Sequence, residues 1–494
     1  MICVCIGRGR HKMTIAEHRH LAEQGVKLVE LRADYIRSRL DIKRLLADRP
    51  CPCIITCRRE EDGGQWSGTE EARITTLRTA IVEGADYVDL EEDIAADIPR
   101  FGPTKRLISY HNFRETPDEL EAIHDRMCTL DADVVKIATM AHRPSDNLRM
   151  LELIRNSKVP TVGICMGEIG MPTRILAGKF GAPFSYAAFH HERTLEPGQL
   201  SYTQMRDIYH YEDIGADTDV YGVIADPIVN DMHPVVQNAG FAEHKLNKVF
   251  VPFRVPRDDL PSFMDTCSDL GVKGLSVTIP HKDEVVRHLS QGDGTVRGIG
   301  SANTVAFEGS QIVGYNTEYR AFSEALDQVF ANHEAGMNLP GRVALIMGSG
   351  TLSRAIAYAL KRREADVILT SRNHERAGVL AERFRCRTLQ WYERMKIQPD
   401  ILINTTPIGM HPNVNEMPFD RKYIQRTTIV VETIYNPEQT LLIKQAREMG
   451  CRVVTGVDVF IRQAALQFER FTGETPSLEL MRNEFKRAMG PAKW

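Results

Sequence analysis

The chain has 494 residues, a length typical of about three domains. Its net charge is −4, from 62 Lys and Arg against 66 Asp and Glu, so no excess of positive charge indicates binding to nucleic acid or to an anionic membrane. The hydrophobic fraction of 43% and the charged fraction of 26% exclude long disorder, collagen and coiled coil, and no apolar run approaches the roughly 20 residues of a transmembrane helix.

The first residues and the cysteines predict a cytoplasmic protein with reduced thiols. Residues 1–12 contain too short an apolar run for a secretory signal and lack an extended transit-peptide composition. The ten cysteines form no CxxC pair, and the first five alternate within apolar runs, as inward and outward strand positions do. These five are Cys3, Cys5, Cys51, Cys53 and Cys57. We therefore expect neither a disulfide framework nor a bound metal.

Eight short apolar runs follow one another through the first 190 residues. They begin at Cys3, Lys27, Cys53, Asp86, Arg106, Asp133, Thr161 and Phe184. Amphipathic stretches lie between most of them, and helices are predicted at 116–130 and 145–156, opened by Thr116-Pro117 and by Ser145. Continuous apolar strands that alternate with helices predict parallel strands buried on both faces. Eight such units favour a (β/α)8 barrel over residues 1–210, with an open doubly wound sheet as the alternative.

The remaining chain predicts two further α/β domains. An acidic, polar segment at 209–219 is predicted to be a linker, and strand–helix alternation continues from Val220 to a second break at 336–341. We expect a substrate-binding domain at 220–336 that is completed by helices within 457–494, whose pattern breaks only near 473–476. Between them, residues 337–456 have the strand–turn–helix pattern of a Rossmann-like domain.

Charged residues stand at the ends of the predicted barrel strands, where barrel enzymes carry their chemistry. The clearest candidate for a catalytic group is Lys136, which lies inside the sixth predicted strand between apolar neighbours. A desolvated amine favours its uncharged form and can form a Schiff base with a carbonyl substrate. His111, on the preceding strand, would lie beside it for proton transfer, and Glu91 could orient the imidazole. The alternative is that Lys136 points outward between helices.

Six motifs of the first half resemble type I 3-dehydroquinate dehydratases over about 200 residues. They are VELRAD at 29–34, DLE at 89–91, SYHNF at 109–113, VVKIATM at 134–140, GMPTRIL at 170–176 and PGQ at 197–199. The resemblance implies that Lys136 forms an imine with the C3 ketone, and that His111, oriented by Glu91, moves the C2 proton and assists loss of the C1 hydroxyl. It assigns substrate binding to Glu30, Arg32, Arg58, Arg174 and Gln199. The family's usual Ser four residues before Gln199 is Leu195 here, with Thr194 as a possible substitute.

The turn after the predicted strand 343–347 indicates a dinucleotide site. Gly348 permits a tight turn, Ser349 follows, and Gly350 lets the helix that opens at Thr351 present its backbone N–H groups to a pyrophosphate. The third glycine of the common pattern is replaced by Ser353.

The next strand ends in Ser371, Arg372 and Asn373, with no acidic residue. Arg372 favours a 2′-phosphate, so we expect NADP rather than NAD.

Further motifs of the second half resemble shikimate dehydrogenases over about 270 residues. They are SVTIPHK at 276–282, SANTV at 301–305, GYNTEY at 314–319, YNPEQT at 435–440 and the helical segment 458–473. The resemblance implies hydride transfer between NADPH and 3-dehydroshikimate, with Lys282 and Glu318 as the catalytic pair. The residues assigned to the substrate are Asp231, His233, Ser276, Thr278, Asn303, Tyr435 and Gln463. In that family Asp stands at the position of Glu318, and two serines stand at the positions of Asp231 and His233.

Both resemblances concern consecutive steps of one pathway. They predict a bifunctional enzyme that converts 3-dehydroquinate to 3-dehydroshikimate and then to shikimate, with small molecules and neither nucleic acid nor membrane as partners. A barrel dehydratase joined to a dehydrogenase for quinate or a related hydroxy acid, a class I aldolase barrel, and a non-catalytic metabolite sensor are the alternatives. The sequence does not predict the oligomeric state.

Overall fold

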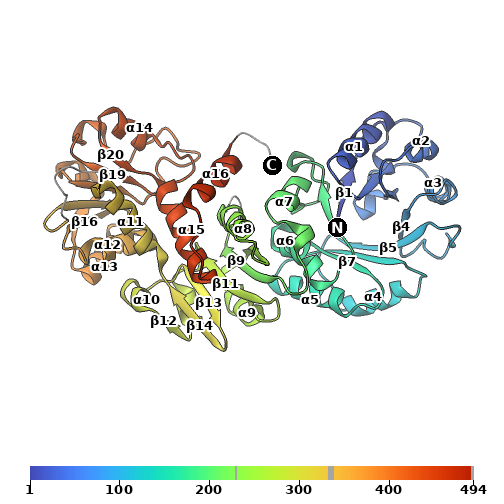
Figure 1. The fold of residues 1–494 in the computed structure, drawn as a ribbon, viewed down its shortest axis with the longest axis horizontal. Coiled ribbons are helices and arrows are strands. Elements are labelled where there is room, and N and C mark those ends of the chain that lie inside the picture. Colours follow the sequence, from blue (N-terminus) through green and yellow to red (C-terminus); the bar gives the residue numbers. More distant parts are fainter. Residues whose placement is uncertain (229–230, 332–338, 491–494) are drawn as a thin grey trace. The chain divides into compact units, whose positions relative to one another are not determined.

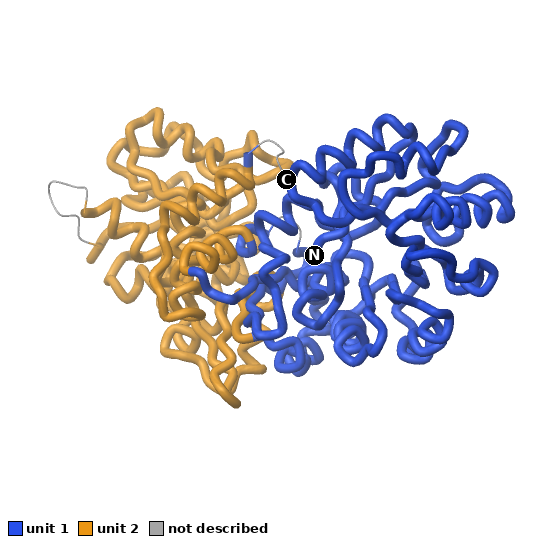
Figure 2. The backbone as a smooth tube through the Cα atoms, turned by 45° about the vertical axis from the view of Figure 1, so that its right-hand side comes forward, with its two compact units in different colours: residues 1–234, 245–272, 490–494 blue, residues 235–244, 273–489 orange. Residues whose placement is uncertain are grey.

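The computed structural model describes residues 1–228, 231–331 and 339–490. The chain folds into two compact units, coloured blue and orange in Figure 2. Met1–Pro234 and Lys245–Val272 make up the main part of unit 1, and Val235–His244 with Lys273–Met489 make up unit 2. No helix in the described part of the chain is long and apolar enough to span a membrane.

Unit 1 contains the predicted barrel. Its eight parallel strands are ordered β7-β6-β5-β4-β3-β2-β1-β8 and form a nearly closed barrel, drawn from blue to green in Figure 1. The strands are β1 (Ile2–Ile6), β2 (Leu28–Arg32), β3 (Cys53–Thr56), β4 (Tyr87–Glu91), β5 (Lys105–Asn112), β6 (Val134–Met140), β7 (Thr161–Met166) and β8 (Ser185–Ala188). All eight predicted runs are strands, and every residue of β1, β2, β3, β7 and β8 is buried. The barrel prediction is confirmed, and the open sheet is excluded.

Helices follow most of these strands. They are α1 (His11–Glu23), α2 (Ile42–Leu46), α3 (Glu70–Val82), α4 (Leu120–Cys128), α5 (Pro144–Asn156), α6 (Gly167–Leu176) and α7 (Tyr202–Asp207). Two predicted helix starts were wrong. Thr116 does not cap α4, because its hydroxyl bonds Thr139 and the Met140 carbonyl instead. Ser145 does not cap α5, which begins one residue earlier, at Pro144 in the N1 position.

The predicted linker at 209–219 is packed rather than solvated. Tyr209 and Tyr211 are buried, although the segment has only a short 3-10 turn at Tyr211–Asp213. Unit 1 continues with β9 (Asp219–Ala225) and β10 (Lys248–Arg254), which pair in parallel, and with α9 (Leu260–Thr266). Helix α8 (His233–Glu243) lies between these two strands in the sequence.

Unit 2 begins with a mixed sheet. Its strands β11 (Val272–Val277), β13 (Thr304–Glu308), β14 (Gln311–Tyr315) and β12 (Gln291–Gly292) are neighbours in that order. Strict strand–helix alternation was wrong here, because β13 and β14 form an antiparallel hairpin with Gly309 at positive φ in its turn. The helices of this region are α10 (Gly294–Ile299) and α11 (Thr317–Ala331).

The Rossmann-like prediction is confirmed by a six-stranded parallel sheet ordered β17-β16-β15-β18-β19-β20. Its strands are β15 (Val343–Met347), β16 (Asp366–Ser371), β17 (Arg387–Gln390), β18 (Ile401–Asn404), β19 (Ile429–Glu432) and β20 (Arg452–Val454), with helices α12 (Thr351–Lys361), α13 (His374–Phe384) and α14 (Leu441–Glu448). Helices α15 (Gly456–Thr472) and α16 (Leu478–Met489) follow, separated near the predicted break. Part of the break at 336–341 lies outside the described residues, and the domain boundaries stay a prediction.

Candidate active sites

Lys136 points into the barrel, not outward between helices. It lies in the middle of β6, and its side chain is 9% exposed. Its Nζ is 3.6 Å from both Glu30 Oε1 and Asp89 Oδ2, and it lies 4.2 Å from the centre of the Tyr186 ring. The amine is thus surrounded by groups from three other strands, β2, β4 and β8.

One pocket collects most of the side chains predicted for the first reaction. It is lined by the predicted residues Glu30, Arg32, Arg58, His111, Lys136 and Gln199. It is also lined by Cys5, Asp62, Phe113, Tyr186 and Glu196, for which no role was predicted. Leu195, which stands in place of the usual Ser, lines it as well. Glu91 and Arg174 lie outside this lining.

His111 has the protonation state that a base needs. Burial lowers the pKa of His111 well below its usual range, and the positive charges of Arg58, Lys136 and Arg32 lower it further. The ring stacks on Phe113 at 6.1 Å, and its Nδ1 has no hydrogen-bond partner within the described ranges. The imidazole is therefore neutral at neutral pH and can accept a proton.

Glu91 holds Arg58 rather than His111. Arg58 donates to Glu91 Oε1 at 3.0 Å, and Arg73 donates to Glu91 Oε2 at 2.7 Å. Arg58 also bonds Asp89 at 2.5 Å and the hydroxyl of Ser109 at 3.0 Å. Burial raises the pKa of Glu91 despite these two arginines. Glu91 therefore holds the Arg58 guanidinium at the wall of the pocket.

Neighbouring cations keep the buried Glu30 carboxylate ionised. Burial alone would raise the pKa of Glu30, but Lys136, Arg32 and Arg58 lower it to about 2. Arg32 is itself held by Asp34 through two hydrogen bonds, at 3.0 and 2.7 Å. A fixed cluster of cations in a water-poor site suits an anionic substrate.

The segment after β8 supplies the edge of the pocket. The Gln199 side chain accepts a hydrogen bond from the Leu195 backbone at 2.9 Å. Arg174 is fully buried, and one of its terminal nitrogens lies 3.0 Å from Glu196 Oε1. The 3.0 Å separation is short enough for an ion pair. The two groups are not oriented for a hydrogen bond, since none of the Arg174 nitrogens has a hydrogen-bond partner in the described chain.

A second constellation lies in unit 2, at the edge of the mixed sheet. The Nζ of Lys282 forms a short ion pair with Glu318 Oε1, and both residues are buried. Glu318 is in the first turn of α11, and its Oε2 lacks a hydrogen-bond partner among the residues the structure describes. A buried amine held by one carboxylate oxygen is suited to proton transfer.

Asn303 is fixed beside this pair. Its Nδ2 donates to Thr317 Oγ1 at 2.9 Å, and its Oδ1 accepts from the Thr317 backbone at 2.8 Å. Gln467 of α15 donates to Ser276 Oγ at 3.0 Å and to the Asn303 carbonyl at 2.9 Å. Ser276, predicted to bind substrate, is therefore hydrogen-bonded to Gln467, which lies one helical turn after the predicted Gln463.

Five other predicted residues have these environments. Tyr435 packs against Phe460 at 5.0 Å and against Phe485 at 6.0 Å between ring centres. Gln463 on α15 and Thr278 after β11 are half-buried. In unit 1, His233 donates from its backbone N–H to Asp231 Oδ1 at 2.8 Å, and its Nδ1 lies 2.7 Å from the same oxygen.

The Rossmann turn fits a dinucleotide. Gly348 has φ +131°, and a Cβ there would lie 2.2 Å from Thr405 Oγ1, so only glycine is accommodated. Ser353 accepts from the Gly350 backbone at 3.1 Å and bonds Thr405 Oγ1 at 2.8 Å. Its hydroxyl thus organises the turn where the common pattern has its third glycine. The N-terminus of α12 is left open to a pyrophosphate.

The end of β16 has the groups expected near an adenosine ribose. The Ser349 hydroxyl donates to Ser371 Oγ at 3.0 Å. Arg372 is exposed and forms no ion pair within the described ranges, whereas Asn373 caps α13 by accepting from the Arg376 backbone at 2.9 Å. The Arg372 guanidinium is thus accessible after the end of β16, where contact with a 2′-phosphate was predicted.

Family models match successive parts of the chain. The type I 3-dehydroquinase model matches residues 2–216, the shikimate dehydrogenase substrate binding domain matches 223–305, and the shikimate 5′-dehydrogenase C-terminal domain matches 456–484. A bifunctional 3-dehydroquinate dehydratase/shikimate dehydrogenase of Arabidopsis thaliana, described as chloroplastic, is 32% identical over 97% of this chain and 83% of its own length. The chain belongs to the bifunctional dehydroquinate dehydratase/shikimate dehydrogenase family.

The dehydrogenase half is also similar to single-function enzymes. The NADP(+)-dependent shikimate dehydrogenase of Methanopyrus kandleri is 34% identical over 54% of this chain and 95% of its own. A shikimate dehydrogenase solved with NADP+ has a TM-score of 0.52 at 30% identity, covering 56% of this chain and 97% of that chain. The enzyme of Aquifex aeolicus has a TM-score of 0.51 at 30% identity, covering 55% and 98%. The chain is therefore a lyase and an NADP-dependent oxidoreductase of the shikimate pathway.

This chain differs from the usual sequence pattern of its family at three places, and the structure shows the surroundings of each. Leu195 lines the dehydratase pocket but offers no side-chain hydrogen bond, and Thr194 does not replace the missing hydroxyl because it is exposed and outside the lining. Glu318 reaches Lys282 despite its extra methylene group. The Asp231 carboxylate lies against His233.

Several side chains of these sites were not predicted. Asp89 ends β4 in the same alternating pattern as Glu91, and Tyr186 occupies an inward position of β8, so their strand positions were the available signal. Gln467 stands four residues after Gln463, a spacing that places both on one helix face. Asp34 is the last residue of the VELRAD motif but was given no role, and nothing in the sequence indicates Arg73; the two act through contacts with Arg32 and Glu91.

Proposed function

We propose that Lys136 is the amine that forms a Schiff base with 3-dehydroquinate. The observation that supports this most is its position inside the barrel, where Nζ lies 3.6 Å from two carboxylates and shares a pocket with His111. The carboxylates hold the ammonium in place in the free enzyme, and loss of its proton makes the amine a nucleophile. Arg32, Arg58 and the buried Arg174 supply the charge that an anionic substrate requires.

The proposed dehydration is balanced in atoms and protons. The Lys136 amine adds to the C3 carbonyl, and loss of water gives the imine. His111 removes a proton from C2, and the electron pair moves toward the imine nitrogen to give an enamine. The C1 hydroxyl leaves as water with the proton that His111 carries, and hydrolysis of the imine releases 3-dehydroshikimate. Glu91 positions Arg58 for this step, through the 3.0 Å hydrogen bond between them.

Covalent trapping tests this proposal. Borohydride added with 3-dehydroquinate should reduce the imine to a stable secondary amine, and peptide mass analysis should map the adduct to Lys136. The same treatment without 3-dehydroquinate is the control. An adduct on another lysine, or none during active turnover, would contradict the assignment.

The acid limb of the dehydratase pH profile should report His111. Because burial and neighbouring cations depress its pKa, the ring stays neutral until the pH falls well below the usual His value of about 6.5. The kcat/KM for 3-dehydroquinate should therefore stay level down to about pH 6.5 and fall only below it. Arg58→Gln removes one of the cations and should move the acid limb to higher pH. An acid limb at or above pH 6.5 in the unaltered enzyme would contradict the proposed base.

In the dehydrogenase half, Lys282 is proposed to give a proton to the C3 carbonyl oxygen of 3-dehydroshikimate. NADPH supplies the hydride equivalent when bound, held by the turn at Gly348–Gly350 and by Arg372. Glu318 orients the Lys282 ammonium through their ion pair, and its second oxygen is buried without a hydrogen-bond partner in the described chain. Asn303, fixed by Thr317, presents its amide beside this pair.

Replacing Arg372 should weaken the preference for NADP. A hydrogen-bonded contact with a charged group contributes about 1.5–3 kcal/mol, so Arg372→Gln should raise the KM for NADPH by about 10- to 100-fold. The KM for NADH should change little, because NADH lacks the 2′-phosphate. Arg421→Gln, which removes an exposed arginine elsewhere in the Rossmann-like domain, is the control. Equal changes for both cofactors would place the 2′-phosphate elsewhere.

A second substrate for the dehydrogenase half is favoured by one observation. Asp231 and His233 stand where the family has two serines, and they bond each other. This pair can select a related hydroxy acid such as quinate. Measuring the oxidation of shikimate and of quinate with NADP and with NAD tests this candidate. Oxidation of shikimate but not of quinate would exclude it.

For the location we propose the cytoplasm, because all ten cysteines are free thiols, as expected in a reducing compartment. Fractionation of the native cells with a tagged chain tests this, and recovery in an organelle would contradict it.

A further inference from the structure

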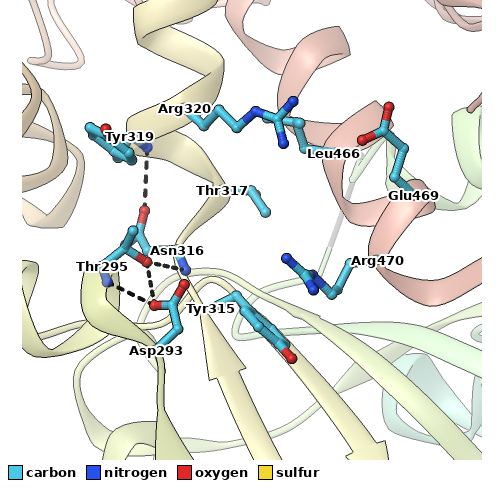
Figure 3. A pocket seen from close by; sticks show the side chains of 10 residues that line it. All are labelled: Asp293, Thr295, Tyr315, Asn316, Thr317, Tyr319, Arg320, Leu466, Glu469 and Arg470. Atoms are coloured by element: carbon cyan, nitrogen blue, oxygen red, sulfur yellow. Dashed lines mark hydrogen bonds between the residues drawn. The ribbon is translucent and has the colours of Figure 1, made fainter. Parts of the chain in front are cut away.

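A cavity of about 290 Å³ lies in unit 2, apart from the residues proposed for catalysis. The ten residues that line it are labelled in Figure 3, and Lys282, Asn303, Glu318 and Gln463 are not among them. Its walls come from the end of β14, the first turn of α11, the start of α10 and the second half of α15. A volume near the lower end of the range for ligand pockets suits a small molecule.

The lining holds charged side chains that form no ion pair within the described residues, namely Arg470, Glu469 and Asp293, whose carboxylate accepts hydrogen bonds from Thr295 and Val296. The Arg470 guanidinium stacks over the Tyr315 ring at 4.2 Å and forms no ion pair within the described residues. Glu469, beside it on α15, likewise forms none in the part of the chain the structure describes. Arg320 is bonded through Nε to Glu324 at 2.7 Å, which leaves its terminal nitrogens for a ligand. Figure 3 draws the Arg320 and Arg470 guanidinium groups on either side of Thr317.

Apolar and aromatic side chains share the rest of the wall with the polar residues Asp293, Thr295, Asn316 and Thr317. Leu466 is buried, and Tyr315 and Tyr319 present their rings. The Tyr315 hydroxyl donates to Glu308 at 3.0 Å, which fixes the ring beneath Arg470. A stacked guanidinium is preorganised for a carboxylate, and a lone carboxylate suits an ammonium group. The cavity thus offers complementary partners for both ends of a zwitterion, and an apolar surface between them.

We propose that this cavity binds a small zwitterion of the free α-amino acid class with an apolar side chain, and that its occupancy alters the dehydrogenase reaction. The α-carboxylate meets Arg470 and Arg320, the α-ammonium meets Glu469, and the side chain lies on Leu466 and the tyrosine rings.

The route to the dehydrogenase site is the first turn of α11. Thr317 lines the cavity, and its hydroxyl and backbone hold the amide of Asn303 at 2.9 and 2.8 Å. The next residue, Glu318, forms the ion pair with Lys282. A ligand that shifts this turn therefore changes both contacts. This second part rests on the roles proposed for Lys282 and Glu318, whereas binding itself does not.

Calorimetric titration of the intact protein tests the binding. L-phenylalanine and L-leucine should bind, whereas 3-phenylpropionate lacks the ammonium, phenethylamine lacks the carboxylate, and both should bind at least about 10-fold more weakly. Arg470→Met and Glu469→Gln should each weaken L-phenylalanine by a similar factor, and the exposed control Arg421→Met should not. Failure of both amino acids to bind at up to about 10 mM, or equal binding by Arg470→Met, would overturn the site.

Steady-state kinetics test the coupling. Saturating L-phenylalanine should change the KM for shikimate by at least about two-fold in the unaltered enzyme and leave the barrel reaction unchanged. The response should be lost in Arg470→Met, whose basal rates should remain normal. Binding without any kinetic change would refute the coupling while the site stands.

Discussion

Replacing Lys136 with alanine should lower kcat for dehydration of 3-dehydroquinate by at least about 10⁴-fold, because removal of a covalent nucleophile abolishes the step that depends on it. Without the imine, the electron pair left by removal of the C2 proton has no cationic nitrogen to accept it. The NADP-dependent oxidation of shikimate should stay within about two-fold of the unaltered enzyme, since distant sites are independent. Both rates are measured on the same preparation.

Lys136→Arg is the control that separates covalent chemistry from charge. Removing the Lys136 amine leaves the buried carboxylates of Glu30 and Asp89, each 3.6 Å away, without its positive charge. Breaking a buried ion pair costs about 3–5 kcal/mol, so Lys136→Ala should also melt earlier. Arginine keeps the charge but is not a nucleophile at neutral pH. Lys136→Arg should thus recover stability and not dehydratase activity, and near-normal dehydration by this variant would refute the imine.

Replacing Lys282 should have the second largest effect, on the other reaction. Lys282→Met should lower kcat for shikimate oxidation by about 10²- to 10⁴-fold, the usual contribution of a positioned acid or base. The dehydratase rate should not change. Because Glu318 is buried and pairs with Lys282, Glu318→Gln should also lower kcat, although by less than loss of the amine itself.

Lys273 provides a matched control for this experiment. It is an exposed lysine on β11, the strand that precedes Lys282. Lys273→Met should leave both activities unchanged, and circular dichroism should show all three variants folded. If Lys282→Met kept more than about a tenth of the dehydrogenase activity, a different group would have to supply the proton.

The barrel was predictable because its strands are buried on both faces. Such strands must be apolar along their whole length, so each is visible as a run of Val, Ile, Leu and Cys without knowledge of its partners. A charged residue inside such a run, as Lys136 is, then stands out. The Rossmann-like turn was predictable for a related reason, since Gly348 is required by a backbone angle of +131° that other residues rarely adopt.

Helix starts and side-chain partners were less predictable. Thr116 has the side chain of a helix cap, but a neighbouring strand offers its hydroxyl a better partner in Thr139. Glu91 was expected beside His111, yet Arg58 and Arg73 reach both of its oxygens. Gln467, rather than Gln463, ties Ser276 to Asn303. Each outcome was decided by a residue far away in the sequence.

The sequence by itself determined the class of fold and the order of its parts, and it supplied the side chains proposed to be reactive, because burial periodicity, turn glycines and motif spacing are local properties. The tertiary structure decided which of those side chains meet. Arg58 bonds Asp89, Glu91 and Ser109 from two neighbouring strands, and Lys282 meets Glu318 from a helix 36 positions later in the chain. Hydrogen bonds and ion pairs depend on distances of a few ångströms, which are fixed only when remote segments pack together.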